Sequence, residues 1–355
     1  MTELYDIAVI GAGPAGATFV RELAKARRDL RIVLIDGQNK ERPKACGGLL
    51  APDAQKVLAS FGLTLPNYVL ADPQIFAVET IDLKSRLVRH YQRHYLNMDR
   101  YAFDTWLISL IPSNAVIIKN KCINIERLQN SFCLTLQNDT KIEATAIVGA
   151  DGASSIVRKR FFNQPTKRYI AIQQRYKENS SSVPHYSCIF DPCTSDSCSW
   201  SIRKDGEIIF GGAFDIKGGR ENFELQKSRF EEYIGSRLGD TTVTEACLVC
   251  SPRKARDIVF GSEGIYLIGE AAGLISASSF EGISSAMLSG KMLAEALCDA
   301  SSDRSAIKSY KIKCRKLQLK LILKMHKRRI LCSYPLRYLI MKSGITSVKK
   351  YNKNS

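Results

Sequence analysis

One stretch decides the fold of this chain: Tyr5-Asp6-Ile7-Ala8-Val9-Ile10-Gly11-Ala12-Gly13-Pro14-Ala15-Gly16. Its first half is short, apolar and rich in β-branched residues, which is typical of a buried parallel strand. Its second half is rich in glycine, and residues 17–27 then carry apolar side chains at helical spacing. The stretch therefore predicts a strand, a tight turn and a helix in direct succession.

A second predicted strand, residues 31–35, ends in Asp36, twenty residues after the last glycine of the turn. A strand, a Gly-x-Gly-x-x-Gly turn, a helix and an acid at this distance form the dinucleotide-binding fingerprint. The first glycine permits the turn, the second lets the backbone approach a pyrophosphate, and the third lets helix and strand pack closely. Free N–H groups and the helix dipole favour the phosphate charge, and the acid accepts hydrogen bonds from the ribose. The nucleotide contacts expected here are Gly11, Ala12, Gly13, Pro14, Ala15, Gly16 and Asp36.

Two later segments distinguish FAD from NAD. Residues 146–152 form a strand-like run that ends in an Asp-Gly turn, and residues 264–273 form another that ends in an acid and a turn of small residues. Their order and spacing resemble the FAD family that includes aromatic-ring hydroxylases and geranylgeranyl reductases. The third motif of that family usually carries Asp where this chain has Glu270, so we expect a small shift of the turn. The further cofactor-binding residues that we expect are Cys122, Asp151, Gly269, Glu270, Gly282 and Ile283.

A cysteine loop follows the second predicted strand. The segment Arg42-Pro43-Lys44-Ala45-Cys46-Gly47-Gly48 looks like the Lys-Pro-x-x-Cys-Gly-Gly segment of geranylgeranyl reductases. By this resemblance the loop lies against the isoalloxazine ring of FAD, so that Cys46 is a candidate catalytic proton donor. Arg100 matches a family helix whose arginine lies near the flavin and the pyrophosphate. The alternative for Cys46 is a small buried hydrophobe, the usual role of a free cysteine. The cofactor-binding residues implied are Lys44, Ala45, Cys46, Gly47, Gly48 and Arg100.

Longer runs resemble one branch of this family, the CbrA-type branch of geranylgeranyl-reductase-like flavoproteins. They are residues 46–55, 186–191 and 269–282, and the resemblance extends over essentially the full length. It implies an α/β fold: a Rossmann-type FAD-binding domain of three-layer ββα architecture, an inserted antiparallel β-sheet substrate domain and a C-terminal helical tail. The expected bounds are 1–50, 96–168 and 255–300 for the FAD-binding domain, 51–95 and 169–254 for the substrate domain, and 301–355 for the basic amphipathic tail.

The substrate domain shows itself as a series of short strand-like runs between residues 170 and 250, with Asp205-Gly206 as a hairpin turn. In the family this sheet lies over the flavin and forms the substrate cavity. Relatives often have Trp-x-Phe-Pro where this chain has Trp200-Ser201-Ile202-Arg203, so we expect a different cavity roof. The candidates for lining the cavity are Gln174, His185, Tyr186 and Trp200, each of which is otherwise a core or surface residue.

The cysteines do not predict a metal site. Cys247 and Cys250 form a Cys-x-x-Cys pair, but the pair lies in an apolar strand-like stretch that directs its side chains to opposite faces. Structural zinc sites prefer two such pairs beside turns. We therefore expect structural thiols and no metal. Hydrolytic catalysis has no support, because the chain contains no His-Glu-x-x-His sequence or triad-like context.

The net charge of +17 comes from one end of the chain. Residues 304–355 hold 16 Lys or Arg residues and no Asp or Glu, which leaves 36 basic against 35 acidic residues elsewhere. Leucine and isoleucine alternate with these bases at roughly helical spacing, which is typical of an interfacial helix on an anionic membrane. The equal and compatible alternative is a helical subdomain packed on the body with a solvated basic face. No recognition fold accompanies the charge, so we expect no nucleic-acid partner.

The N-terminal sequence predicts a cytoplasmic protein. No basic leader precedes the first strand, and no run of about 18 apolar residues suits a transmembrane helix. Through the basic tail, such a protein could contact the inner face of the membrane peripherally.

These features predict an FAD-dependent oxidoreductase. The first interpretation is a reductase that transfers hydride from the flavin to a C=C bond of an isoprenoid or other lipid-like substrate. Its electron donor is external, and NADPH, ferredoxin and another flavoprotein remain open. The second interpretation is an FAD-dependent monooxygenase acting on a small or polycyclic molecule. The third is a non-catalytic flavin-binding protein associated with the membrane.

Overall fold

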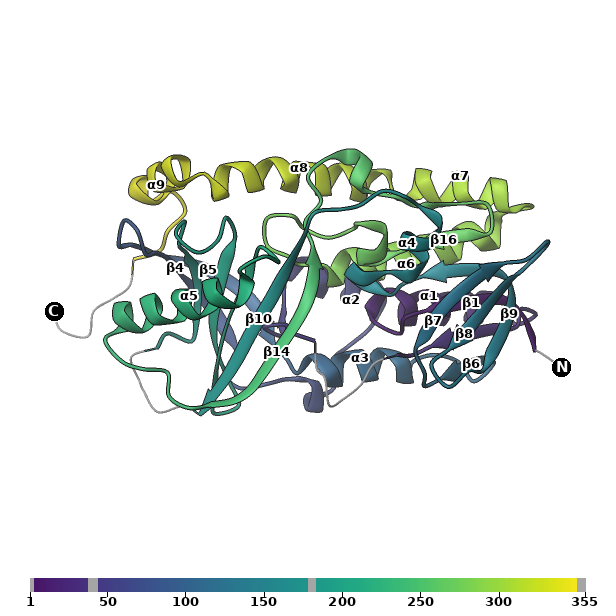
Figure 1. Ribbon diagram of the computed structural model, residues 1–355, viewed down its shortest axis with the longest axis horizontal. Coiled ribbons are helices and arrows are strands. Elements are labelled where there is room, and N and C mark those ends of the chain that lie inside the picture. Colours follow the sequence, from purple (N-terminus) through teal and green to yellow (C-terminus); the bar gives the residue numbers. More distant parts are fainter. Residues whose placement is uncertain (1–2, 38–43, 178–182, 350–355) are drawn as a thin grey trace.

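The computed structural model describes residues 3–37, 44–177 and 183–349, so Arg42 and Pro43 of the cysteine loop lie outside the described residues. Two eight-stranded sheets lie one after the other along the long axis, and a row of helices crosses above both (Figure 1). We call them sheet A and sheet B. The α/β fold class predicted from the sequence, with its antiparallel second sheet and helical tail, is confirmed.

Sheet A brings the ends of its parallel strands to one edge. β1 pairs in parallel with β2 and β9, and Ile10 lies opposite both Ile35 and Gly149. Leu267 of β16 also lies opposite Gly149. The loops that follow these four strand positions therefore meet beyond one edge, where ligands bind in open α/β sheets. The strand order is β15 (Gly261–Ser262), β16 (Ile265–Leu267), β9 (Lys141–Gly149), β1 (Leu4–Ile10), β2 (Ile32–Ile35), β6 (Ala115–Ile118), while β8 (Phe132–Leu136) pairs with β9 and β7 (Cys122–Arg127) pairs with β8.

Two helices pack together beside this edge, α1 (Pro14–Ala26) and α6 (Ile283–Asp299). Their close approach requires Gly290, because a Cβ there would lie 2.5 Å from the carbonyl oxygen of Ala15. Phe19 and Leu23 of α1 are fully buried in the same core as β1. The apolar strand predicted at the start of the chain is thus buried by the helix that follows it.

Sheet B is antiparallel except where β4 pairs in parallel with β11. The predicted hairpin is present, since β12 and β13 pair across Asp205 and Gly206, which both have positive φ, 51° and 77°. Two-residue hairpin turns favour such angles because they match the twist of the strands. Helix α5 (Gly219–Ile234) covers one face of the sheet through Phe223 and Phe230. The strand order is β14 (Thr241–Cys250), β10 (Arg168–Lys177), β13 (Glu207–Phe214), β12 (Cys198–Lys204), β11 (Tyr186–Phe190), β4 (Ile75–Asp82), β5 (Leu87–Asn97), β3 (Leu49–Leu50).

Short helices fill the junction between the sheets. Phe103 and Trp106 of α3 share an apolar cluster with Leu50, Met98 and Met287, which links β3 of sheet B to α3 and α6. The exact domain bounds given above stay a prediction. The remaining elements are α2 (Pro52–Ser60), α3 (Arg100–Ser109), α4 (Ile156–Phe161), and the 3-10 helices η1 (Asn67–Val69), η2 (Gly152–Ser154), η3 (Ala255–Asp257) and η4 (Gly269–Ala272).

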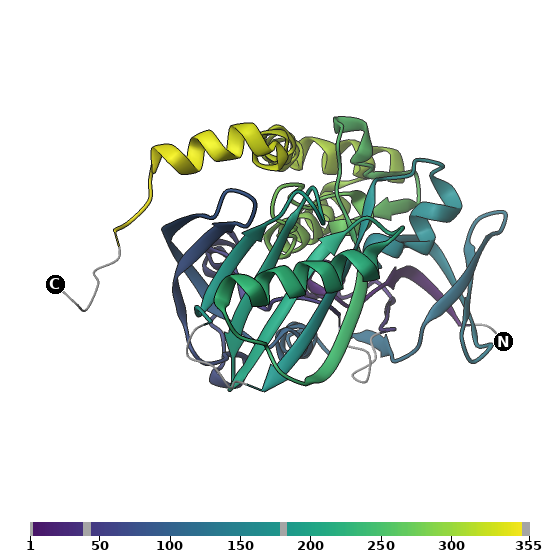
Figure 2. The same ribbon diagram turned by 60° about the vertical axis from the view of Figure 1, so that its left-hand side comes forward.

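The basic tail forms three helices, α7 (Asp303–Lys313), α8 (Arg315–Cys332) and α9 (Tyr334–Ser343), which run in a row along one side of the molecule (Figures 1 and 2). Their inner side packs on the body: Leu317, Leu321 and Met325 of α8 are buried at helical spacing. The tail is therefore a packed helical layer. Within the described part of the chain, none of the helices has the length and apolar character needed to span a bilayer.

Candidate functional site

The glycine-rich turn after β1 has two glycines that the fold itself requires. Gly11 has φ 105°, and a Cβ there would lie 2.5 Å from the carbonyl oxygen of Ala150. A Cβ at Gly16 would lie only 1.9 Å from the carbonyl oxygen of Gly11. Gly13 differs, because no heavy atom of the described residues lies within 4 Å of its hypothetical Cβ. The lack of a side chain at Gly13 therefore leaves open space in front of the turn.

This open space lies at the N-terminus of α1. The helix begins at Pro14, and no side chain accepts a hydrogen bond from its first turn among the described residues. Those N–H groups and the positive helix end favour an anion. Asp36 lies buried at the end of the neighbouring β2, with its carboxylate 3.1 Å from the ammonium of Lys119. The structure thus brings open space in front of Gly13 and a buried acid to adjacent strand ends.

The Asp-Gly turn after β9 lies on the other side of the same opening. Asp151 accepts from the backbone N–H of Ile156 at 2.7 Å, while its second oxygen is buried and has no partner among the described residues. Burial raises the pKa of Asp151 to about 6. Cys122 at the start of β7 lies near this carboxyl, and burial raises the pKa of its thiol to about 12. The buried carboxyl oxygen is free to bind a hydroxyl group of a ligand.

The third motif is tied to both sheets through Glu270. One oxygen of this carboxylate accepts from the backbone N–H of Cys250 at 2.8 Å, and the other accepts from Lys44 at 3.3 Å. The nearby negative charge raises the pKa of Lys44. Gly269 has φ 58°, and a Cβ there would lie 2.8 Å from that of Ala15, so the motif packs directly on α1. Gly282 and Ile283 form the start of α6.

The cysteine loop joins this arrangement to sheet B. The sulfur of Cys46 accepts from the backbone N–H of Gly48 at 3.5 Å and from the guanidinium of Arg100 at 3.8 Å. Arg100 is itself held by Asp104 at 2.9 Å. The carbonyl of Ala45 accepts from the thiol of Cys247 at 3.5 Å. Cys46 therefore lies at the junction between the nucleotide turns and the second sheet.

A buried lysine that we did not predict holds the same loop. Lys204, the last residue of β12, donates from its ammonium to the carbonyl oxygens of Gly47 at 3.0 Å and Gly48 at 3.2 Å, and to that of Met98. Burial lowers its pKa to about 8. A Cβ at Gly48, where φ is 64°, would collide with this ammonium. Lys204 directly precedes the hairpin turn in sequence, and only the long-range packing shows that it is buried.

One glutamine prediction requires correction. Gln174 points to the α5 side of sheet B, where its amide contacts Thr244 and Lys227. Gln173 occupies the opposite face and donates to the carbonyl of Cys46 at 3.4 Å, while also donating to Glu245. Because side chains alternate along a strand, an error of one residue moves the side chain to the wrong face. Gln173 therefore takes the place that we expected for Gln174.

The other predicted lining residues lie in two places. Trp200 packs beside Gly47 and Gly211, and its indole N–H is buried without a partner among the described residues. Tyr186 is partly buried and meets Tyr95 edge to face, with ring centroids 5.7 Å apart. His185 is exposed just before β11. The structure thus brings Trp200 and Tyr186 toward the cysteine loop and leaves His185 at the surface.

Tyr95 and Glu281 form a polar pair that the sequence analysis missed. The hydroxyl of Tyr95 donates to Glu281 at 3.0 Å, and Ser279 donates to the other oxygen of the same carboxylate at 3.0 Å. Burial raises the pKa of Tyr95 well above its usual value, so the phenol keeps its proton. Lys324 of α8 lies 3.7 Å from Glu281. Only Glu281 adjoins Gly282 in sequence, and no local signal pointed to Tyr95.

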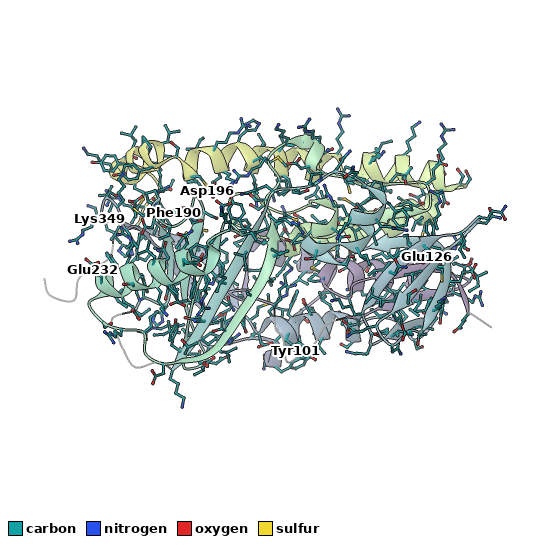
Figure 3. The ribbon with its side chains drawn as sticks, viewed as in Figure 1. Tyr101, Glu126, Phe190, Asp196, Glu232 and Lys349 are labelled. Atoms are coloured by element: carbon teal, nitrogen blue, oxygen red, sulfur yellow. The ribbon has the colours of Figure 1, made fainter. Side chains whose placement is uncertain are left out.

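A second group of charged residues attaches α8 to sheet B. Arg328, almost fully buried, donates to the Tyr169 hydroxyl at 2.8 Å and to Asp196 at 2.9 Å. Burial acts to raise the pKa of Asp196, but the hydrogen bond from Tyr169 and the charges of Arg328 and Arg253 hold it below its ordinary value. Figure 3 shows Asp196 directly beneath α8. This group fixes α8 against Tyr169 of β10 and the segment that carries Asp196.

The residues present fit FAD. Open space before Gly13 and uncapped N–H groups suit a pyrophosphate, Asp36 suits a ribose, and the free oxygen of Asp151 suits a ribityl hydroxyl. Gly47 and Gly48 let the Cys46 loop pack closely on sheet B, because a Cβ at either would collide with Ile202 or Lys204. The Cys-x-x-Cys residues, by contrast, make separate contacts, Cys247 with Ala45 and Cys250 with Ala153. Within the described ranges, no cluster of three or more potential metal ligands occurs.

Known proteins resemble this chain in sequence and in fold. The family model described as lycopene cyclase protein matches residues 6–176. Protein CbrA of Escherichia coli O6:H1 is 41% identical over 355 residues, which cover 98% of this chain and 95% of that protein. A geranylgeranyl bacteriochlorophyll reductase-like protein from Thermoplasma acidophilum superimposes with a TM-score of 0.83 at 18% identity, covering 100% of this chain and 94% of the other.

A solved monooxygenase-type structure has a similar fold. PqsL from Pseudomonas aeruginosa, described as a probable FAD-dependent monooxygenase, superimposes with a TM-score of 0.69 at 15% identity and covers 97% of this chain and 100% of its own. The chain therefore has the fold of FAD-dependent oxidoreductases and monooxygenases, and the flavin assignment agrees with the open space at Gly13.

Proposed function

The chain belongs to the CbrA protein family, and we propose that it is an FAD-dependent reductase, which transfers hydride from the flavin to a C=C bond of an isoprenoid or other lipid-like substrate. The observation that carries this proposal is the cysteine loop at the seam of the two sheets. Lys44 of this loop pairs with Glu270 of the third nucleotide motif, while Gly47 and Gly48 are held by Lys204 of sheet B. One short loop thus couples the cofactor side to the substrate side.

The chain's own residues supply binding and shielding. The turn at Gly13 binds the diphosphate, Asp36 binds the ribose, and Asp151 binds a ribityl hydroxyl. Gln173 and Trp200 of sheet B contact the cysteine loop directly, so they fix the position of this loop and shield it from water. FAD supplies the hydride when bound, and an external donor, NADPH, ferredoxin or another flavoprotein, supplies the electrons.

Reduction of an isolated double bond requires a proton as well as a hydride. One alkene carbon receives the hydride, and the π electron pair takes the proton at the other carbon. Cys46 is the first candidate donor, because its sulfur accepts from Gly48 and Arg100 and its own proton is not committed to a described acceptor. Tyr95 is the second, because its phenol stays protonated beside Glu281. General acid catalysis of this kind contributes about 10²- to 10⁴-fold in rate.

The lipid-like substrate follows from what lines the seam. Trp200, Tyr186 and Tyr95 present aromatic surface on the side of sheet B away from α5. The charged groups on this side, among them Glu281, Lys204 and Glu245, are hydrogen-bonded within the protein. A long apolar chain suits such a surface better than a charged metabolite.

The test uses purified full-length protein. Copurifying lipid is extracted and identified by mass spectrometry, and the reduced, anaerobic protein is then mixed with a polyprenyl alcohol. We expect the flavin spectrum to return as the lipid gains two hydrogen atoms per reduced bond. A colourless protein that refuses added FAD, or recovery of only a water-soluble aromatic molecule, contradicts the proposal.

An FAD-dependent monooxygenase is the second candidate, favoured by the likeness to PqsL in fold and by the absence of Phe-Pro after Trp200. Mixing the reduced protein with air distinguishes the two activities. A transient hydroperoxide absorbance that decays only when a small aromatic substrate is present favours oxygenation. Rapid, featureless reoxidation favours the reductase.

A further inference from the structure

Exposed apolar side chains are concentrated on the C-terminal layer. Of the 20 large hydrophobic residues that are exposed within the described ranges, nine lie between Ile312 and Val348. This segment is about a tenth of the chain, so the enrichment is several-fold. Single exposed leucines are normal on a protein surface, whereas a gathered set marks an interaction site. Those on the helices include Ile312, Leu319, Leu323, Ile330, Leu336 and Leu339.

The exposed apolar residues of α8 form a stripe opposite its packed side. Leu317 and Leu321 face the body and are buried, while Leu319 and Leu323 are 54% and 69% exposed. Two residues correspond to about 200° around a helix of 3.6 residues per turn. A surface helix with a single partner carries one apolar stripe. The second stripe of α8 has no partner among the described residues, and we call this side of α7–α9 the outer face.

The charge of the outer face has one sign. No Asp or Glu occurs after Asp303. Several other tail bases are paired with carboxylates of the body, as the buried Arg328 is with Asp196, the buried Arg337 with Asp82 and the exposed Lys320 with Asp53. Six exposed bases of the tail form no ion pair with a described carboxylate: Lys311, Arg315, Lys316, Lys327, Arg329 and Lys342. The outer face therefore combines leucine side chains with uncompensated positive charge.

We propose that the outer face of α7–α9 docks on an anionic lipid bilayer. Amphipathic interfacial helices insert apolar side chains at the boundary of the acyl chains while their lysines and arginines bind anionic headgroups. A second copy of the chain is a poor occupant, because a two-fold contact through this face would oppose two positive surfaces. Nucleic acid is also a poor occupant, because its phosphates would cover the leucines.

The shape of the layer suits a flat partner. The three helices follow one another along the long axis on one side of the molecule (Figure 1), with a combined length of about 60 Å at 1.5 Å per residue. Long side chains tipped with nitrogen project outward along this row (Figure 3). The inner side of α8 meanwhile places Lys324 3.7 Å from Glu281 at the candidate site. The helix that rests on the bilayer therefore also borders the site, which goes beyond the proposed reaction and does not depend on it.

The test is vesicle sedimentation with the purified full-length protein. We expect it to bind vesicles of phosphatidylcholine mixed with phosphatidylglycerol, to bind phosphatidylcholine alone much less, and to lose binding as salt is raised. Neutralising the exposed bases by Lys316→Gln, Lys327→Gln and Arg329→Gln weakens binding at least about tenfold. The apolar variant Leu319→Gln, Leu323→Gln and Leu339→Gln weakens it similarly, including at high salt where headgroup attraction is screened.

Matched variants elsewhere on the surface separate docking from general charge and folding. Lys141→Gln, Lys177→Gln and Lys217→Gln remove the same charge from exposed sites, and Ile216→Gln with Leu225→Gln alters exposed apolar residues near and on α5. We expect wild-type binding and wild-type thermal unfolding from both sets. Equal binding by all variants, or no preference for anionic vesicles, overturns the proposal. Concentration-dependent self-association that the apolar variant abolishes assigns the face to a second copy and also overturns it. None of these results depends on flavin turnover.

Discussion

The ammonium group of Lys204 lies 3.0 Å from the carbonyl oxygen of Gly47. It forms no ion pair with a carboxylate of the described residues. A buried lysine thus binds the cysteine loop through backbone oxygens alone. The contact joins the end of a strand in sheet B to the loop that carries Cys46, which are separated by more than 150 residues in sequence. Burial holds the lysine pKa at about 8, below its ordinary value of 10.5.

This pKa predicts how stability depends on pH. Between about pH 8 and 10.5 the unfolded chain binds more protons at Lys204 than the folded chain does, so the free energy of unfolding rises with pH across this window. The stability gained in this way is lost again as the pH falls to about 8. The full change is about 3 kcal/mol. Denaturant unfolding of wild type and Lys204→Met, compared at several pH values, measures it. A constant difference between the two proteins across this window refutes the assignment.

The glycines of the first turn predict two different failures. Gly16→Ala places a Cβ 1.9 Å from the carbonyl oxygen of Gly11, so we expect a strongly destabilised or insoluble protein. Gly13→Ala meets no described atom within 4 Å and keeps wild-type unfolding. It narrows the pyrophosphate space, however, and we expect at least about tenfold weaker FAD binding. Thermal unfolding of the two variants checks their stability, and a flavin titration followed by fluorescence checks the FAD affinity of Gly13→Ala. Unchanged flavin affinity in Gly13→Ala means that the cofactor binds elsewhere.

The ion pair between Arg337 and Asp82 predicts a large stability effect. Both side chains are almost completely buried, 2.8 Å apart, and attach α9 to β4. Removing one partner by Arg337→Met leaves a buried charge unpaired, which costs about 3 to 5 kcal/mol. The exposed Arg315→Met serves as the control, with a change within about 0.5 kcal/mol. Both values come from chemical denaturation, and equal stability of the two variants contradicts the prediction.

Cys46→Ala tests the proton donor. If the thiol supplies the proton, the rate of lipid reduction falls about 10²-fold or more while flavin binding is retained. Cys193→Ala, at an exposed cysteine, is expected to behave as wild type. Stopped-flow reoxidation by a polyprenyl acceptor in H₂O and D₂O gives the rates. Full activity in Cys46→Ala together with a loss in Tyr95→Phe transfers the role to Tyr95.

Much of the nucleotide end could be predicted because its signals are local. The strand, turn and helix of residues 5–27, the acid at position 36 and the Asp205-Gly206 hairpin each depend on neighbours in sequence. Their backbone preferences therefore appear directly in the residue pattern. The fold class followed from the order of such segments and from the family resemblance.

The contents of the site were less predictable because they depend on register and on distant packing. Gln173 and Gln174 are indistinguishable by composition, and only the pairing of β10 with its neighbours directs Gln173 to the cysteine loop. Lys204 and the pair of Tyr95 with Glu281 come from segments that meet only in the folded chain. Nothing near them in sequence specifies a partner.

The sequence by itself determined a dinucleotide fold and a tail in which basic and apolar residues alternate. Only the tertiary structure decided which tail residues turn inward. Arg328 and Arg337 are buried against Asp196 and Asp82, whereas Leu319 and Leu323 remain exposed. A helix with apolar residues on two opposite sides can pack on the body through either side. The carboxylates and cavities that the rest of the chain presents to the helix decide which side faces inward.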